Sequence, residues 1–216
     1  MAPPADTPTP DPAFAAAAPR PEVAAPPRTG PDAVAILRAI GRALLRQPRA
    51  LAWWLPIAWA ACIWRLSSES QVLGVGLSLP EWLQSILHDL AHPTAFGLLA
   101  LFLVPLMPRV GAGATRWVAW SLPRAGAIFI AVAAWGLVDE WHQSHTPGRV
   151  PSLLDTLSDV VGAGGVLVVV GYLSRPDARR GGLVLRLCVV ALACVAAATL
   201  SSGFTWITDR GLWPFG

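Results

Sequence analysis

The chain has 216 residues, of which 54% are hydrophobic and only 13% are charged. Soluble proteins carry about 25% charged residues, so much of this chain does not face water. The net charge is +3 and all 16 basic residues are arginines. They do not alternate with aromatic residues, which argues against a nucleic-acid partner. The three cysteines lie in apolar runs, with the spacing of neither a zinc site nor a disulfide framework.

The N-terminal region divides into a tail and a basic amphipathic segment. Residues 1–31 hold ten of the 21 prolines together with many alanines, and we expect a disordered cytoplasmic tail there. Residues 32–49 place apolar side chains at helical spacing with arginines between them, which predicts a helix on an anionic membrane surface. These residues are Ile36, Leu37, Ile40, Leu44 and Leu45, with Arg38, Arg42, Arg46 and Arg49.

Five apolar segments follow, and they predict an all-α, polytopic membrane bundle of about five transmembrane helices. They cover residues 51–67, 89–107, 125–141, 156–173 and 183–201. A helix needs about 20 residues, or about 17 at the shortest, to cross the hydrocarbon core. Several segments therefore cross only if their polar ends lie at the interface, and full crossing by 183–201 is an open question. We group residues 51–175 as one transmembrane domain and residues 183–216 as an extra helix with a short tail.

The placement of arginines predicts the orientation in the membrane. Twelve arginines lie before the first segment, between the second and third, and between the fourth and fifth, whereas Arg65, Arg149 and Arg210 lie on the opposite side. Cytoplasmic loops carry the excess of basic residues. We therefore expect a bacterial cytoplasmic (inner) membrane protein with its N-terminus in the cytoplasm and its C-terminus outside. All four histidines and the hairpin acids would then lie at the outer face.

A polar hairpin connects segments 125–141 and 156–173. Asp139, Glu140 and Gln143 end the first of these helices, while Asp155 and Asp159 lie one turn apart at the start of the next. Asp155 suits a helix N-cap, where a carboxylate accepts backbone N–H bonds, but Asp159 lies too far inside for that role. Asp139 and Glu140 lie at a helix C-terminus, where the helix dipole disfavours anions. Capping explains neither of them, so both are candidates for function.

Acids at these positions need partners. A charged side chain at the bilayer centre costs about 2.5–3.5 kcal/mol on insertion scales, so the hairpin acids must lie in the interface or pair inside the bundle. Arg149 is the permanent cation of the hairpin, and a bidentate bond from it to Glu140 or Asp155 is the natural pairing. Gly162, three residues after Asp159, indicates close helix packing and not a phosphate-binding loop.

Two histidines precede segment 89–107 or lie at its start. His88 and His92 are four residues apart with Asp89 between them, a spacing at which two imidazoles can share one metal ion. The alternative is that both histidines form hydrogen bonds with the hairpin acids. Pro93 suits the first turn of a helix, which would make His92 an anchor pointing inward. Candidates for a further metal ligand are His142, His145, Glu140 and Asp155. Because no third ligand is fixed, we assign neither a metal nor a cofactor.

The hairpin also carries a long, spaced motif. It consists of Asp139-Glu140-x-His142-Gln143, Pro147-Gly148-Arg149, Ser152-x2-Asp155 and Asp159-x2-Gly162. This pattern closely resembles the signature of the VanZ-like family of bacterial membrane proteins, over about residues 55–175. Two weaker elements agree, namely Leu66-Ser67-Ser68 and the set Asp89, His92 and Phe96. The family commonly has Asp-Lys before this histidine, where the present chain has His88-Asp89-Leu90.

The resemblance implies a membrane protein that acts at the cell envelope, because the founding member is similar to proteins linked to glycopeptide resistance, notably to teicoplanin. Our first hypothesis is a protein that binds or remodels an envelope component at the outer membrane face. Arg149 would bind an anionic group such as a lipid phosphate, while Glu140, Gln143 and Asp155 would hold that group or a sugar. The full set of binding candidates is Asp89, His92, Asp139, Glu140, Gln143, Arg149, Asp155 and Asp159.

Two other classes of function remain open. The first is a membrane-embedded hydrolase or transferase acting on an envelope lipid or glycan, in which Glu140, His142 and Asp155 are the catalytic candidates for acid–base work. The second is a small transporter, which ranks last because the chain is short, lacks an inverted repeat and gathers its acids at one face. The lipid bilayer is the expected partner in every case, and the sequence predicts no oligomeric state.

Overall fold

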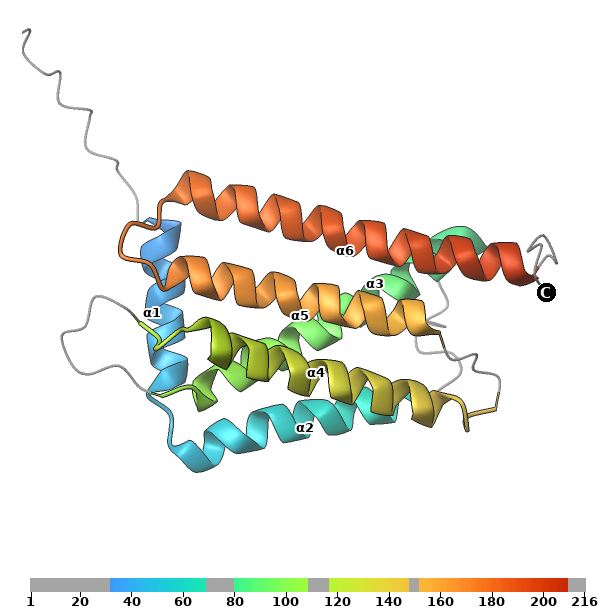
Figure 1. Ribbon diagram of the computed structural model, residues 1–216, viewed down its shortest axis with the longest axis horizontal. Coiled ribbons are helices and arrows are strands. Elements are labelled where there is room, and N and C mark those ends of the chain that lie inside the picture. Colours follow the sequence, from blue (N-terminus) through green and yellow to red (C-terminus); the bar gives the residue numbers. More distant parts are fainter. Residues whose placement is uncertain (1–31, 69–79, 109–116, 148–151, 210–216) are drawn as a thin grey trace, which may run out of the picture. The chain divides into compact units, whose positions relative to one another are not determined.

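The computed structural model describes residues 32–68, 80–108, 117–147 and 152–209. Within these ranges the chain is helical and contains no β-strand (Figure 1). The tail expected at residues 1–31, Arg149 and the segment after Asp209 lie outside the described residues. The helices are α1 (Ala33–Leu45), α2 (Arg49–Ser67), α3 (Glu81–Leu103), the 3-10 turn η2 (Val104–Leu106), α4 (Leu122–Gln143), α5 (Leu153–Leu173) and α6 (Arg180–Asp209).

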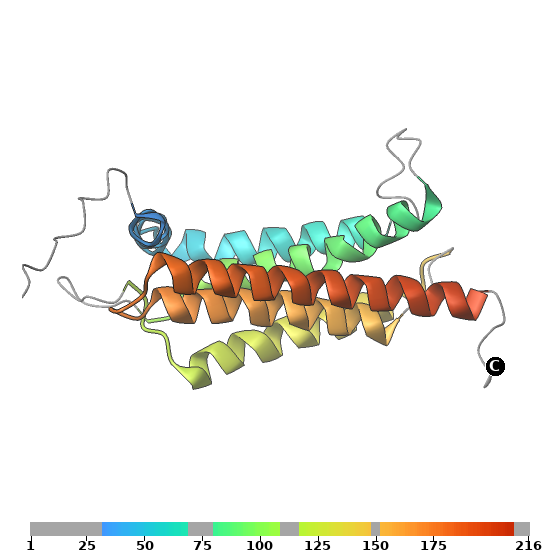
Figure 2. The same cartoon turned by 90° about the horizontal axis from the view of Figure 1, so that it is seen from above.

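The predicted all-α membrane bundle is confirmed. Four helices are long and apolar enough to cross a membrane: Trp82–Leu106, Leu122–Gln143, Leu153–Leu173 and Arg180–Phe204. The predicted segment 183–201 lies in the last of them, which has the highest hydropathy of the four. The predicted segment 51–67 forms α2, a helix of 19 residues that carries an arginine near each end. Helices α2 to α6 run side by side in both views (Figures 1 and 2).

Helix α3 corrects the sequence prediction at its start. It begins at Glu81, eight residues before the apolar segment was expected to begin, because Glu81, Gln84 and Ser85 lower the hydropathy of the first turns without preventing a helix. Pro93 therefore lies inside the helix. The prediction that it lies in the first turn is wrong. His92 is correspondingly about 16 Å from the start of α3, at 1.5 Å per residue.

Helix α1 lies crosswise at one end of the other helices and is seen end-on in Figure 2. Asp32 caps its N-terminus by accepting a hydrogen bond from the Val34 backbone N–H. The Arg38 side chain donates hydrogen bonds to the carbonyls of Leu173 and Arg175, just after the end of α5. These bonds satisfy orphan carbonyls at a helix C-terminus, where a cation is also favoured by the helix dipole. They fix α1 against the bundle.

Two apolar clusters form the core. One lies towards the α1 end and includes Val104, Trp117, Val118 and Leu167. The other lies between α2, α3, α4 and α5 and comprises Ile63, Phe96, Leu99, Ala100, Val132 and Ala163. Large apolar side chains such as Ile130 and Leu192 are also exposed on the outer surfaces of α4 and α6. Exposed apolar surface of this extent fits a bilayer environment.

The closest helix contact joins α3 to α5. At Gly162 of α5, a Cβ atom would lie 1.9 Å from the Pro93 carbonyl oxygen, so only glycine fits there. Gly97, one turn along α3, lies close to the Gly162 backbone in turn. The sequence prediction of helix packing at Gly162 is thus confirmed, and it places the α3 residues around His92 directly against α5.

A candidate polar site at one end of the helices

The predicted site residues gather at the end of the helices opposite α1. The C-terminal ends of α2, α4 and α6 lie there together with the N-terminal ends of α3 and α5 (Figure 1). Four acids at this end are buried: Asp89, Asp139, Glu140 and Asp159. Buried acids are expected to be paired or hydrogen-bonded, so the partner of each one defines the site.

His92 and Asp159 form a pair between α3 and α5. The His92 Nδ1 atom lies 3.1 Å from the Asp159 Oδ1 atom. The Asp159 side chain is completely buried, whereas the His92 side chain is 11% exposed. Gly136 of α4 makes room for the second Asp159 oxygen, because a Cβ there would approach it to 3.0 Å. The His92 ring also lies parallel to the Phe96 ring, with centroids 6.5 Å apart.

Asp139 connects α4 to α2. Its Oδ1 atom lies 2.5 Å from the Ser67 Oγ atom at the end of α2, and its Oδ2 atom accepts a hydrogen bond of 2.9 Å from the Gln143 side-chain amide. All three side chains are buried. The Ser67 hydroxyl also lies 2.8 Å from the Ile63 carbonyl, so its single proton has two competing acceptors. The dipole-disfavoured position of Asp139 is therefore compensated by two side-chain donors.

Glu140 organises the start of α5. Its Oε2 atom accepts a hydrogen bond of 2.7 Å from the Ser152 backbone N–H, and Ser152 itself caps α5 by accepting from the Leu154 N–H at 3.2 Å. The predicted N-cap role of Asp155 is therefore wrong: a serine three residues earlier performs it. The other Glu140 oxygen is buried without a hydrogen-bond partner among the described residues. Its expected partner Arg149 lies outside those residues.

Helix α6 supplies partners that the sequence did not indicate. The Ser201 hydroxyl donates to Asp155 Oδ1 at 2.7 Å, and the neighbouring Ser202 hydroxyl donates to Asp89 Oδ2. Ser85 of α3 adds a third hydroxyl, 3.3 Å from that of Ser202. The available signal was a pair of serines inside an otherwise apolar helix. Both serines lie outside the motif at residues 55–175, which carries no signal for them.

The remaining histidines contact aromatic rings at this end of the helices. His142 stacks on Trp64 of α2 with ring centroids 3.8 Å apart, and His145 is exposed beside Trp141. The rings of His88 and His92 meet edge to face at 5.9 Å. Within the described ranges no three His, Cys, Asp or Glu side chains lie close enough to hold a metal ion. The Nδ1 atom of His92 is also already engaged by Asp159.

A small cavity of about 100 Å³ opens between α2, α3 and α4. Its polar lining comes from Ser67, His88, His92, Asp139 and Gln143, and its apolar lining includes Ile63 and Phe96. This volume accommodates several water molecules or one small polar group. Glu140 and Asp155 are not among the lining residues, so the structure divides the predicted set. His92, Asp139 and Gln143 share this cavity, while Glu140 and Asp155 hold helix ends together.

The cavity offers a mixed set of hydrogen-bonding groups. Asp139 supplies acceptor oxygens, and Gln143 supplies an amide with both donor and acceptor atoms. His92 contacts Asp159 through Nδ1, so its Nε2 atom is the ring nitrogen that does not take part in that bond. Such a set suits hydroxyl and amide groups of a ligand.

Comparison of the chain with protein-family models, with curated proteins and with solved structures found no match.

Proposed function

We propose that the chain is a VanZ-like integral membrane protein that binds a polar cell-envelope component at the outer face of the cytoplasmic membrane. The observation that carries this proposal is the cavity lined by Ser67, His92, Asp139 and Gln143 from three helices. Buried polar groups are costly unless they have partners. Three buried groups, on Ser67, Asp139 and Gln143, and the partly buried His92 surround one opening, which favours a site for a hydrogen-bonding ligand.

The ligand class follows from the lining groups. A carboxylate, a carboxamide and an imidazole together with a hydroxyl match the hydroxyl and amide groups of an envelope glycan or lipid headgroup. The excess of arginines at the opposite end supports an outward position for this end of the helices, where such ligands are found. Arg149, in the α4–α5 connection, would add an anion-binding group for a phosphate. The motif from Asp139 to Gly162 supports the family and its link to glycopeptide resistance of the teicoplanin type.

The test combines susceptibility with protein level. Asp139→Asn keeps the size of the side chain but removes its acceptor charge towards Ser67 and Gln143, and Asp177→Asn makes the same change at the opposite end of the helices. We expect cells that express the wild type or Asp177→Asn to tolerate teicoplanin better than control cells, and cells with Asp139→Asn to lose that protection at equal membrane protein level. Equal tolerance for all three chains, or a loss that follows the protein level, refutes the proposal.

A second candidate function is hydrolysis or group transfer on an envelope lipid or glycan. The observation that favours it is the His92–Asp159 pair, because a histidine held by a buried carboxylate at Nδ1 presents its other nitrogen as a base. His92 is one of the residues that line the cavity. We therefore propose His92 as the base in place of the candidates Glu140 and His142.

Turnover distinguishes this candidate from simple binding. Purified protein is incubated with a lipid-linked glycan, and release of the glycan is measured for the wild type, His92→Gln and Glu140→Gln. If His92 is the base, His92→Gln should release no glycan but should still bind the lipid-linked glycan. Release that is equal in the wild type and His92→Gln rules out His92 as the base.

A further inference from the structure

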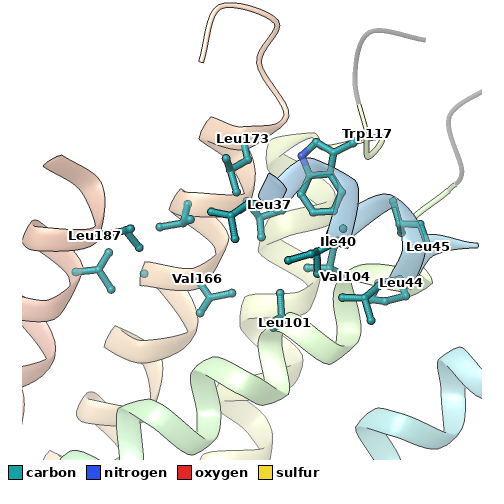
Figure 3. Close-up of a pocket in the computed structure, with 16 residues that line it drawn as sticks. Leu37, Ile40, Leu44, Leu45, Leu101, Val104, Trp117, Val166, Leu173 and Leu187 are labelled. Atoms are coloured by element: carbon teal, nitrogen blue, oxygen red, sulfur yellow. The ribbon is translucent and has the colours of Figure 1, made fainter. Parts of the chain in front are cut away.

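A second and larger cavity lies at the other end of the helices. It has a volume of about 310 Å³ and is enclosed by α1, α3, α5 and α6 together with Trp117 (Figure 3). Every lining residue is apolar, and Trp117 brings only an indole N–H that has no hydrogen-bond partner in the described chain. Sites for small ligands start at about 300 Å³, so the cavity is large enough for one extended hydrocarbon group.

The amphipathic character of α1 creates this cavity. Leu37, Ile40 and Leu44 point from α1 towards the cavity (Figure 3). Helical spacing places Arg42, and Arg46 at the C-cap of the helix, on the opposite side. Ile40 is 52% exposed and Leu187 of α6 is 46% exposed, although both line the cavity. The cavity is therefore open between these two helices. Helix α1 lies crosswise at the ends of the membrane helices (Figure 1). In a bilayer, an amphipathic helix at such a position lies where lipid headgroups meet hydrocarbon.

The charge at this end of the helices favours an anionic headgroup. At this end of the helices the described residues contain nine arginines and two acids, Asp32 and Asp177. The arginines are Arg38, Arg42, Arg46, Arg49, Arg124, Arg175, Arg179, Arg180 and Arg186. Basic residues beside a membrane attract anionic lipids, and arginine binds phosphate in a bidentate manner. An uncharged or cationic occupant would gain nothing from this field.

We propose that the cavity beneath α1 binds one acyl chain of an anionic phospholipid, whose phosphate lies among the arginines of α1. The hydrocarbon lining selects the chain, and the arginines select the headgroup. This site is separate from the polar cavity at the opposite end, and it does not depend on the function proposed there. The lipid would fill the space between α1 and α6 that protein side chains leave open.

The test measures retained lipid on the full-length protein by native mass spectrometry, after purification and addition of phosphatidylglycerol or phosphatidylcholine. We expect one phosphatidylglycerol to remain bound under conditions that remove phosphatidylcholine. Val169→Phe fills the cavity, since Val169 is one of its lining residues, and should weaken retention at least about tenfold. Val168→Phe adds the same volume at an exposed position of α5 that does not line the cavity, and it should retain lipid as the wild type does.

A second variant keeps the proposal falsifiable if Val169→Phe does not fold. Arg42→Gln combined with Arg46→Gln alters two exposed side chains, which leaves folding intact, and should reduce the preference for phosphatidylglycerol over phosphatidylcholine. Equal retention of both lipids by the wild type overturns the proposal. So does retention of phosphatidylglycerol by folded Val169→Phe at the wild-type level, or a second copy of the chain in place of lipid.

Discussion

Replacing Gly162 with alanine tests whether the α3–α5 contact holds the polar site together. The added Cβ would lie 1.9 Å from the carbonyl oxygen and 2.6 Å from the carbonyl carbon of Pro93, both of them backbone atoms. Backbone cannot rotate away as a side chain does, so α3 and α5 must separate. This separation occurs beside His92 and only three residues from Asp159, whose side chains are 3.1 Å apart.

The magnitude follows from two opposing terms. Overpacking costs about 1–3 kcal/mol, and contact with backbone on a neighbouring helix places this case near the upper end. Replacing a helical glycine with alanine returns about 1 kcal/mol through helix propensity. The net loss is about 2 kcal/mol, which corresponds to a decrease in Tm of about 4–8 °C for a chain of this size.

Thermal unfolding of purified protein in one detergent provides the measurement. Gly126→Ala in α4 is the matched control, because a Cβ at Gly126 meets no atom within 4 Å. Gly126→Ala gains helix propensity without any steric clash, so its Tm should equal or exceed that of the wild type. Gly162→Ala with a Tm at or above that of Gly126→Ala would refute the reasoning.

Two further predictions concern polar contacts. Ser201→Ala removes the hydroxyl that donates to Asp155 at 2.7 Å, and it should lower the free energy of unfolding by about 1.5–3 kcal/mol. Thr199→Ala, whose hydroxyl bonds to carbonyls of its own helix, should lower it much less. Equal losses for the two variants would contradict the α5–α6 hydrogen bond. In the α5–α6 connection, hydrogen bonds from Arg175 lower the pKa of the exposed Asp177 carboxyl below 3.8. The small stabilisation is therefore complete above pH 3.8 and lost as the pH falls through the lower pKa. Arg175→Gln should raise the pKa, followed by NMR, towards its ordinary value, and an unchanged pKa would exclude this pairing.

The sequence by itself determined the class of fold. Long apolar segments must be helical in a bilayer, since every backbone group needs an internal hydrogen bond there, and composition alone revealed them. Local spacing also predicted the amphipathic helix at residues 32–49, which the structure has at Ala33–Leu45, and the close packing at Gly162, because both depend on which residues share one helix face. The acids of the hairpin stood out because they break an apolar pattern.

Only the tertiary structure decided which groups the acids contact. His92 and Asp159 are 67 positions apart, Asp139 and Ser67 are 72 apart, and Asp89 contacts Ser202 over 113 positions. No local rule relates such residues, because their separation depends on how whole helices pack.

Sequence patterns also misplaced two local features. The hydropathy pattern put the start of the second apolar segment at residue 89, although the helix begins at Glu81. A carboxylate in the first turn suggested a cap at Asp155, but the Ser152 hydroxyl occupies that role and Asp155 turns to α6. Both differences have the same physical reason. Packing between helices determines where a helix ends and which partners a buried polar group has. The cavity beneath α1 likewise exists only because α1, α3, α5, α6 and Trp117 meet around it.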